Sequence, residues 1–163
     1  MNFDSLAALG AHVAMLAGRM EAIEHAGLDP AAKLVEQTAK EEIGTYQQAW
    51  GPFVAWAPLA ASTEASKAAK GYPAGAPLLA TGDMRDSIRR DVHGLAAVIG
   101  STDPKMVYHE LGTSKMPPRP VLGPALYRNK DQILSILGRA TFEGILYGRL
   151  VGGARYQFDE GQK

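Results

Sequence analysis

The sequence predicts an α+β domain in which long helices at both ends of the chain flank a small antiparallel β-sheet with a long central loop. Apolar residues repeat every three or four positions near both ends, two short β-favouring runs lie near residue 90, and proline and glycine interrupt the stretch before them. The 163 residues are close to the commonest size of one domain. We expect a single domain over 1–163, made of helices over 1–50, a long loop over 51–82, a hairpin and a proline arm over 83–120, a C-terminal helix over 121–150 and a tail over 151–163.

Two helices are expected before residue 50. The first follows from the apolar repeat over residues 3–23, and Gly27, Asp29 and Pro30 are a stop signal after it. Asp29 is then expected to cap a second helix with Pro30 in its first turn. The apolar stripe of the second helix comprises Ala32, Val35, Ala39, Ile43, Tyr46 and Trp50.

Residues 51–82 are expected to be a long connection, because scattered prolines and glycines break every regular pattern there. Within it we expect a short helix over 62–70 and a short strand over 53–56. The segment is also a candidate contact surface, since apolar residues in a loop are costly to expose. We expect Trp50 in the core, whereas Trp56 either closes the core or faces a partner.

A hairpin is predicted by the β-favouring runs 87–92 and 95–99, with His93-Gly94 as the turn. Asp103-Pro104 is expected to open a helical turn that Gly112 closes. Three prolines within 116–120 fix φ and remove backbone donors, so this stretch should be an extended, pre-organised arm.

The last element is expected to be one helix from about residue 120 to residue 150, with Pro124 in its first turn. Its glycines Gly138, Gly144 and Gly148 mean that the helix bends there or that a neighbouring backbone packs closely. The tail after Leu150 is expected to fray.

Composition excludes several classes of protein. Lys plus Arg and Asp plus Glu number 17 each, so no net field draws the chain to nucleic acid or to an anionic membrane. The absence of cysteine excludes disulfides and thiolate metal sites, and fits assembly in the cytoplasm. Asp4 before and Arg19 after the first apolar run are the reverse of a signal peptide, and no apolar stretch reaches the ~20 residues of a membrane span.

The sequence departs from each of the enzyme motifs that it partly resembles. His109-Glu110 begins like a zinc protease motif, but Thr113 stands where the second histidine belongs. The sequence from Gly112 to Met116 resembles a nucleophile elbow with methionine in place of its closing glycine. No phosphate-binding Gly-Lys-Ser/Thr sequence is present. We therefore expect no catalysis, no cofactor and no metal.

A cluster of alternating charges follows residue 82. Its acidic members are Asp83, Asp86 and Asp91, and its basic members are Arg85, Arg89 and Arg90. Alternating signs are typical of a solvated face with exposed ion pairs, and we prefer this interpretation to paired catalytic carboxylates.

Two segments within residues 50–150 carry a family resemblance. The first reads Thr-Gly-x-x-Arg-x-Ser-Ile from Thr81 to Ile88, and the second reads Glu-x-Gly-Thr-Ser-x-x-x-x-Arg-Pro from Glu110 to Pro120. Together they resemble the tail-component family of tailed bacteriophages, described as head-tail joining or tail completion proteins. The sequence Trp-Ala-Pro-Leu at 56–59 is similar to the related Mu-type virion morphogenesis proteins.

The resemblance implies a structural virion protein of the phage neck or tail, assembled in the bacterial host cytoplasm. It implies no catalysis, a ring of six copies, and contacts to the tail tube or tail terminator protein and to the head-side connector or stopper protein. Membranes are not implied, and nucleic acid would be limited to DNA passing through the ring.

Candidate interface residues come from these motifs. Tyr108 and Arg119 belong to residue types enriched at interface hot spots, and a stiff arm loses little conformational entropy on docking. The alternative is that both only pin the arm to its own domain. The full candidate set is Trp56, Tyr108, Glu110, Gly112, Thr113, Lys115, Arg119 and Pro120.

The same residues are compatible with other functions. Within the structural class, a tail terminator or a head-side connector fits as well as tail completion. From a different class, a phage-encoded protein that binds a host protein also fits. A DNA-contacting neck component would require Arg85, Arg89 and Arg90 to form one patch.

Overall fold

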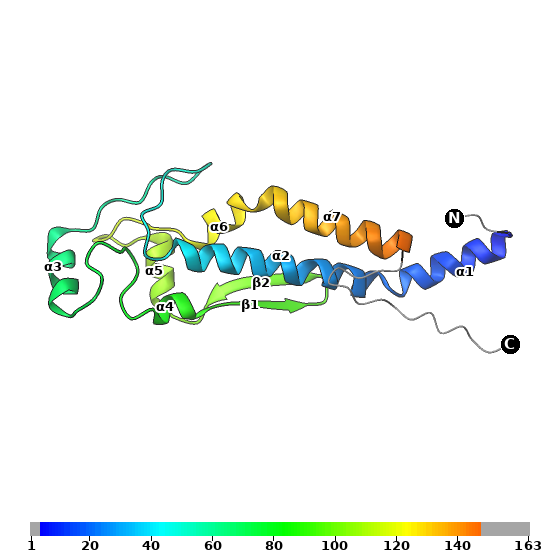
Figure 1. Cartoon of the computed structure of the whole chain (residues 1–163), viewed down its shortest axis with the longest axis horizontal. Helices are drawn as coiled ribbons and strands as arrows, with labels where there is room; N and C mark the ends of the chain where they lie inside the picture. Colours follow the sequence, from blue (N-terminus) through cyan, green and yellow to red (C-terminus); the bar gives the residue numbers. More distant parts are fainter. Residues whose placement is uncertain (1–3, 148–163) are drawn as a thin grey trace.

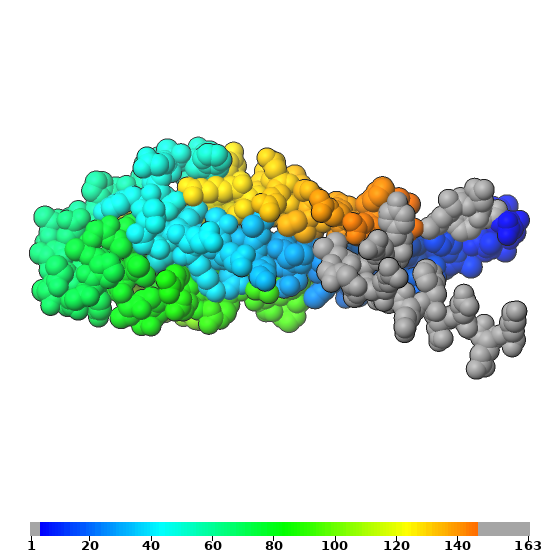
Figure 2. Space-filling model, viewed as in Figure 1, coloured from blue at the N-terminus to red at the C-terminus, as the bar shows by residue number. Residues whose placement is uncertain are grey.

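A central helix, α2, lies between a second long helix on one side and a β-hairpin on the other (Figure 1). The structure is a computed structural model and describes residues 4–147. Its helices and two-stranded antiparallel sheet confirm the α+β class with helices flanking a small sheet. The molecule is elongated, with α1 at one end and α3 at the other (Figure 2).

The two N-terminal helices divide at a different place from the one expected. Helix α1 spans Leu6–Ala17 and α2 spans Met20–Glu42, so the break falls at Gly18 and Arg19. The expected stop at Gly27 and Pro30 is wrong, because α2 continues through both residues.

Packing explains why α2 continues there. A Cβ on Gly27 would lie 2.9 Å from Cβ of Ala140, so this glycine permits close contact with the C-terminal helix instead of ending its own. The buried residues Ile23, Ala31 and Ala32 surround Pro30 in the chain, and their packing offsets the roughly 3 kcal/mol that an interior proline costs a helix.

The end of α2 also differs from the expectation. The helix ends at Glu42, where Ile43 is extended and Gly44 adopts a positive φ of 101°. Tyr46 and Trp50 therefore lie outside the helix. Trp50 is 53% exposed whereas Trp56 is 5% exposed, so the expectation of Trp50 in the core is wrong.

The long connection contains the expected short helix, α3, over Ala61–Ala69. The expected strand over 53–56 is wrong, since only an isolated bridge between Trp50 and Phe53 forms there. An additional short helix, α4, spans Asp83–Asp86 before the hairpin.

The hairpin is confirmed, with a shifted turn. Strand β1 spans Ile88–His93 and pairs with β2, Ala96–Ser101, from Ile88 opposite Ser101 to His93 opposite Ala96. The two-residue loop is therefore Gly94-Leu95, in which Gly94 has the positive φ of 53° that such turns use.

After the hairpin, helix α5 spans Lys105–Leu111 and ends at Gly112, as expected. The expected single C-terminal helix is instead two helices, α6 over Leu122–Arg128 and α7 over Lys130–Tyr147, which meet at Asn129. Nδ2 of Asn129 donates to the hydroxyl of Thr38 and to the Ala125 carbonyl, which ties the break to α2.

The glycines of α7 differ in their surroundings. A Cβ on Gly144 would lie 2.5 Å from Cγ2 of Ile23, which confirms close packing there, whereas a Cβ on Gly138 would meet nothing within 4 Å. The contacts of Ile23 with Gly144 and of Gly27 with Ala140 show that α2 and α7 run antiparallel. The expectations for Gly148 and for the tail lie outside the described residues.

One hydrophobic core joins α2, α6 and the hairpin. Residues from all three elements, and from the connection, α4 and α5, are buried together: Val35, Ala39, Ile43, Trp56, Met84, Ile88, Met106, Val121 and Ala125. None of these core residues comes from α1.

Within residues 4–147, each helix taken singly is too short or too polar to cross a membrane. The pair α1 and α2, bent by 41° at the break between them, meets the length and composition criteria together.

Candidate interaction surface

The arm, residues 112–120, leaves α5 through a position that only glycine fills well. Gly112 has a φ of 73°, and a Cβ there would lie 2.9 Å from the amide nitrogen of Pro118 and 3.0 Å from the carbonyl oxygen of Met116. The amide of Thr113 donates to the Met116 carbonyl at 2.8 Å, and the Met116 amide donates back at 3.2 Å. These two bonds close a tight turn at the tip of the arm.

Arg119 fixes the base of the arm from inside the protein. Its side chain is 4% exposed, and its Nη2 donates to the carbonyl oxygens of Ala57 at 2.9 Å and Pro58 at 3.2 Å. The Arg119 amide also donates to the His109 carbonyl at 2.6 Å. The guanidinium therefore joins the arm to the long connection, and α5 holds its backbone.

Trp56 makes the reciprocal contact from the connection to the arm. Its indole Nε1 donates to the Pro120 carbonyl at 3.2 Å, while its own amide donates to the Gln47 carbonyl at 2.9 Å. We call the hydrogen bonds of Arg119 and Trp56 to these carbonyls the arm brace. It crosses between two segments about sixty residues apart in the chain.

Glu110 orients the chain beyond the arm. One oxygen, Oε1, accepts from the amides of Val121 at 2.8 Å and Leu122 at 2.7 Å. The first amides of a helix lack partners within the helix, and a carboxylate there is favourable. Glu110 of α5 thus sets where α6 begins.

The predicted interface residues fall into two groups. Arg119 and Trp56 are buried within the chain, so in this structure the pinning alternative describes Arg119 and the core alternative describes Trp56. Glu110, Gly112 and Pro120 are half-buried and shape the arm. Exposed members of the set are Tyr108, Thr113 and Lys115.

The sequence patterns did not identify Val107 and Leu111, two exposed apolar residues beside Tyr108. Val107 is 55% exposed, Tyr108 57% and Leu111 77%, so α5 presents an apolar face next to the arm. The sequence did contain a signal for this exposed face. Residues 106–108 and 111 are all apolar or aromatic, and one buried face of a short helix cannot accommodate all four. We call this face, together with the exposed Thr113 and Lys115 at the tip of the arm, the arm surface.

A hollow of about 480 Å³ lies behind the arm, between it, α3 and the connection. Its walls are mostly apolar, and its charged or titratable lining residues are Lys67, His109, Lys115 and Arg119, with no carboxylate among them. Burial, followed by the charge of Arg119, lowers the pKa of His109, and its Nδ1 is buried with no hydrogen-bond partner in residues 4–147. The hollow therefore favours an apolar group with a negative charge at its edge.

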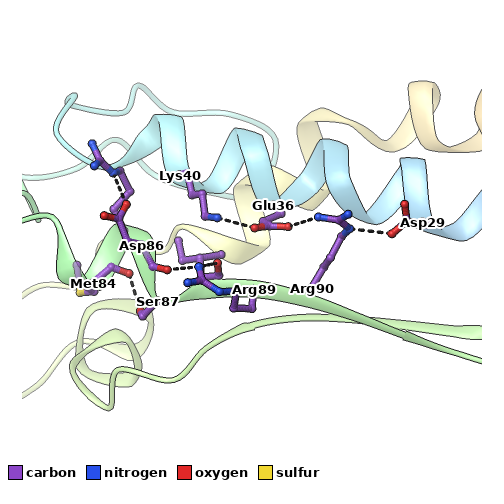
Figure 3. Close-up of polar contacts among 10 residues, drawn as sticks. Asp29, Glu36, Lys40, Met84, Asp86, Ser87, Arg89 and Arg90 are labelled. Carbon is purple, nitrogen blue, oxygen red and sulfur yellow. Dashed lines mark hydrogen bonds and ion pairs between the residues drawn. The ribbon is translucent and has the colours of Figure 1, made fainter.

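The three arginines near the hairpin do not form one patch. Arg85 pairs with Asp86 at 3.0 Å, and Arg89 donates to the carbonyls of Asp86 and Ile88. Arg90 points the other way and binds Asp29 and Glu36 of α2 (Figure 3). The requirement of a DNA-contacting neck component is not met, and the expected solvated face is wrong for Arg90.

A buried charge cluster lies between α2 and α6. Glu42 is 3% exposed and its Oε1 is 3.3 Å from Nη1 of Arg128, which also donates to Gln47 Oε1. Neither oxygen of Glu42 accepts a hydrogen bond from the described residues. Burial outweighs the attraction of Arg128 and, together with the smaller repulsion from Glu110, raises the pKa of Glu42 to about 7.

Residues 4–147 contain no cluster of three or more histidine or carboxylate side chains placed to hold a metal ion. Comparison with known proteins found no matching family model, no similar curated protein and no similar solved structure.

Proposed function

We propose that this chain is a structural protein of a tailed-bacteriophage particle, which joins the tail to the head as a tail completion protein in the neck. It acts in an oligomeric ring of six copies, assembled in the host cytoplasm, and it is not an enzyme. Its other partners are the tail tube or tail terminator protein on one side and the head-side connector or stopper protein on the other.

The arm brace is the observation that carries this proposal. Glu110 and Arg119 are the charged residues of the motif that resembles the phage family, and both form hydrogen bonds with backbone groups of the chain itself. A catalytic site would instead aim such groups at a substrate. Here they hold a proline arm rigid while Thr113 and Lys115 at its tip face outward. A stiff exposed loop suits a protein partner, because little entropy is lost when it docks.

The arm surface supports the same conclusion. Val107, Tyr108 and Leu111 are each more than half exposed on one short helix, and contiguous exposed apolar residues mark sites of protein contact. The neighbouring hollow adds positive potential beside an apolar wall. Charge complementarity of this kind selects partners more than it adds affinity.

The decisive experiment interrupts the gene in the phage or prophage that carries it and images the lysate by electron microscopy. Filled heads beside separate or defective tails are the expected result. Intact infectious particles would contradict the proposal. If the protein is absent from purified wild-type particles, the rival binding protein that acts on a host protein is favoured instead.

Complementation then tests the arm surface itself. The double variant Tyr108→Ala and Lys115→Glu should fail to restore joined particles, because it removes an apolar contact and reverses a charge at exposed positions. Val98→Ala on the hairpin is the matched control, since Val98 is 66% exposed and belongs to neither α5 nor the arm. Chemical cross-links in purified particles would separate tail completion from the tail terminator and the head-side connector.

A further inference from the structure

Helix α1 is apolar but contributes no residue to the core that residues 4–147 form. None of its 12 residues is buried, and Leu6 is 87% exposed, Leu9 39% and Val13 54%. Residues 5–18 contain no Asp, Glu, Lys or Arg. A neutral helix with large apolar side chains in water is typical of an element that is covered in an assembly.

A groove of matching character lies on the opposite half of the molecule. It encloses about 460 Å³ and is formed by Phe53, α6 and the first turns of α7. Leu126 is 54% exposed, Tyr127 46% and Leu134 59% along it. Among the residues that line this groove, Lys130 alone is charged.

The two surfaces lie apart in one copy. Thr38, which binds Asn129 beside the groove, lies 18 residues beyond the start of α2, or about 27 Å along the helix. Helix α1 is about 18 Å long, so folded back along α2 it would not reach this end of the groove. The flank of α2 that leads toward the groove is already occupied by α7, at Gly27 and Ile23.

Charge is complementary as well. Docking α1 into the groove buries no charged residue of the helix, so no desolvation of an ion opposes it. Asp4 immediately precedes α1, and Lys130 is the charged residue of the groove. Their opposite charges favour one direction of the docked helix.

We propose that α1 of one copy lies in the groove of the next copy, formed there by Phe53, α6 and the start of α7. Such a contact joins two different surfaces, so an open row of copies keeps one helix and one groove uncovered, and all are covered only when the row closes on itself as a ring. The inference deepens the proposed ring, on which it rests for the number of copies. It identifies the surfaces that join neighbouring subunits, with α1 at an end of the elongated molecule as Figure 2 shows.

The absence of cysteine in the chain gives a direct test with purified full-length protein. Separate variants carry Leu6→Cys, Leu9→Cys or Val13→Cys in α1, and each is mixed with the Leu134→Cys variant and oxidised with diamide. We expect a covalent dimer containing one copy of each variant, identified by mass spectrometry of the joined peptides. Val98→Cys, at 66% exposure on β2, replaces Leu134→Cys as the control and should give no dimer above background.

Cysteines in both surfaces of one chain sharpen the test. The variant with Val13→Cys and Leu134→Cys should form a ladder of covalent oligomers that ends at the ring number. Dimers that join only α1 to α1 would overturn the proposal, because they indicate a two-fold contact. Yields equal to the Val98→Cys control at all three α1 positions, or a chain that is monomeric at its highest soluble concentration, would also overturn it.

A charge substitution tests the same contact without oxidation. Val13→Asp should reduce the mass in analytical ultracentrifugation toward the 17.4 kDa monomer, while circular dichroism still shows a folded helical chain because α1 is outside the core. An unchanged oligomer would contradict the proposal. Cross-linking succeeds or fails independently of the particle experiment, so a failed neck role and a failed subunit contact give different results.

Discussion

Nη1 of Arg90 lies 2.7 Å from Oε2 of Glu36, and this ion pair joins the β-hairpin to the central helix. Arg90 Nε also contacts Asp29 at 2.9 Å, and Lys40 binds the other oxygen of Glu36 (Figure 3). Burial opposes ionisation of Glu36, but the hydrogen bonds from Lys40 and Arg90 outweigh it and hold the pKa of Glu36 below its ordinary value.

Replacing Arg90 should therefore destabilise the fold. Arg90→Ala removes two charge-assisted hydrogen bonds and leaves the buried Glu36 with Lys40 alone, so we expect a loss of about 1–3 kcal/mol in the free energy of unfolding. Arg89→Ala, at the next and exposed position of β1, is the control and should change stability by less than about 0.5 kcal/mol. Urea unfolding of both variants measures the difference, and equal losses would contradict it.

The glycines of α7 give a second matched pair. Gly144→Ala places a Cβ 2.5 Å from Ile23 in the tight contact with α2, and we expect it to destabilise by about 1–3 kcal/mol. Gly138→Ala meets nothing within 4 Å, so its higher helix propensity should stabilise by about 0.5–1 kcal/mol. Thermal unfolding would show opposite shifts of the midpoint. A stabilising Gly144→Ala would mean that α2 and α7 are less closely packed.

Glu42 predicts an unusual pH dependence of stability. Its folded-state pKa of about 7 lies above the ordinary value of 4.5 for this carboxyl group, so the folded chain binds a proton more tightly than the unfolded chain. The contribution of Glu42 is greatest below about pH 4.5 and is lost as pH rises toward 7, by roughly 3 kcal/mol in the limit. Glu42→Gln should flatten this slope between pH 5 and about 7.5. The exposed Glu41→Gln should leave the slope in place.

Substitution of Arg119 should show how the arm responds when the hydrogen bonds of the arm brace are removed. Arg119→Ala leaves the carbonyls of Ala57 and Pro58 without this donor, which should cost about 2 kcal/mol or more and expose the arm to proteases. Arg119→Lys keeps the charge but cannot span both carbonyls with a planar fork, so it should rescue the loss only in part. Limited proteolysis with mass spectrometry of the cut sites measures this. Full rescue by lysine would show that charge alone holds the arm.

The two tryptophans should differ in fluorescence. Trp50 is 53% exposed and lies under the Arg128 guanidinium at 5.9 Å, whereas Trp56 is 5% exposed. Trp50→Phe should remove the component that iodide or acrylamide quenches, and Trp56→Phe should remove the shielded, blue-shifted component. If Trp56 alone were quenched, its place in the core would be wrong.

Local signals in the sequence predicted local structure well. The hairpin, α3 and the turn ended by Gly112 follow from short-range rules of turn and helix chemistry, and each of these elements forms where the residues favour it. Tyr108 and Lys115, two of the candidate interface residues, are exposed.

Features set by distant contacts were beyond the sequence patterns. Gly27 and Pro30 are a strong helix-stop signal, yet contact with Ala140 far along the chain keeps α2 continuous through both. Trp56 is buried and Trp50 is exposed, the reverse of what the helical stripe favoured for Trp50. The burial of Trp56 depends on its hydrogen bond to the Pro120 carbonyl, which lies 64 residues away in the chain. Arg90 and Arg89 are neighbours with the same charge, and only the pleat of β1 decides which one faces α2.

The arm brace has a mechanical consequence. Arg119 and Trp56 cross between the arm and the connection in both directions, so a pull on the tip loads their hydrogen bonds together and transmits the force to the core around Trp56. Bonds that share a load break at once instead of unzipping in sequence. The force that the arm withstands before it detaches is therefore set by the rate at which the arm brace ruptures, and not by the equilibrium stability of the fold.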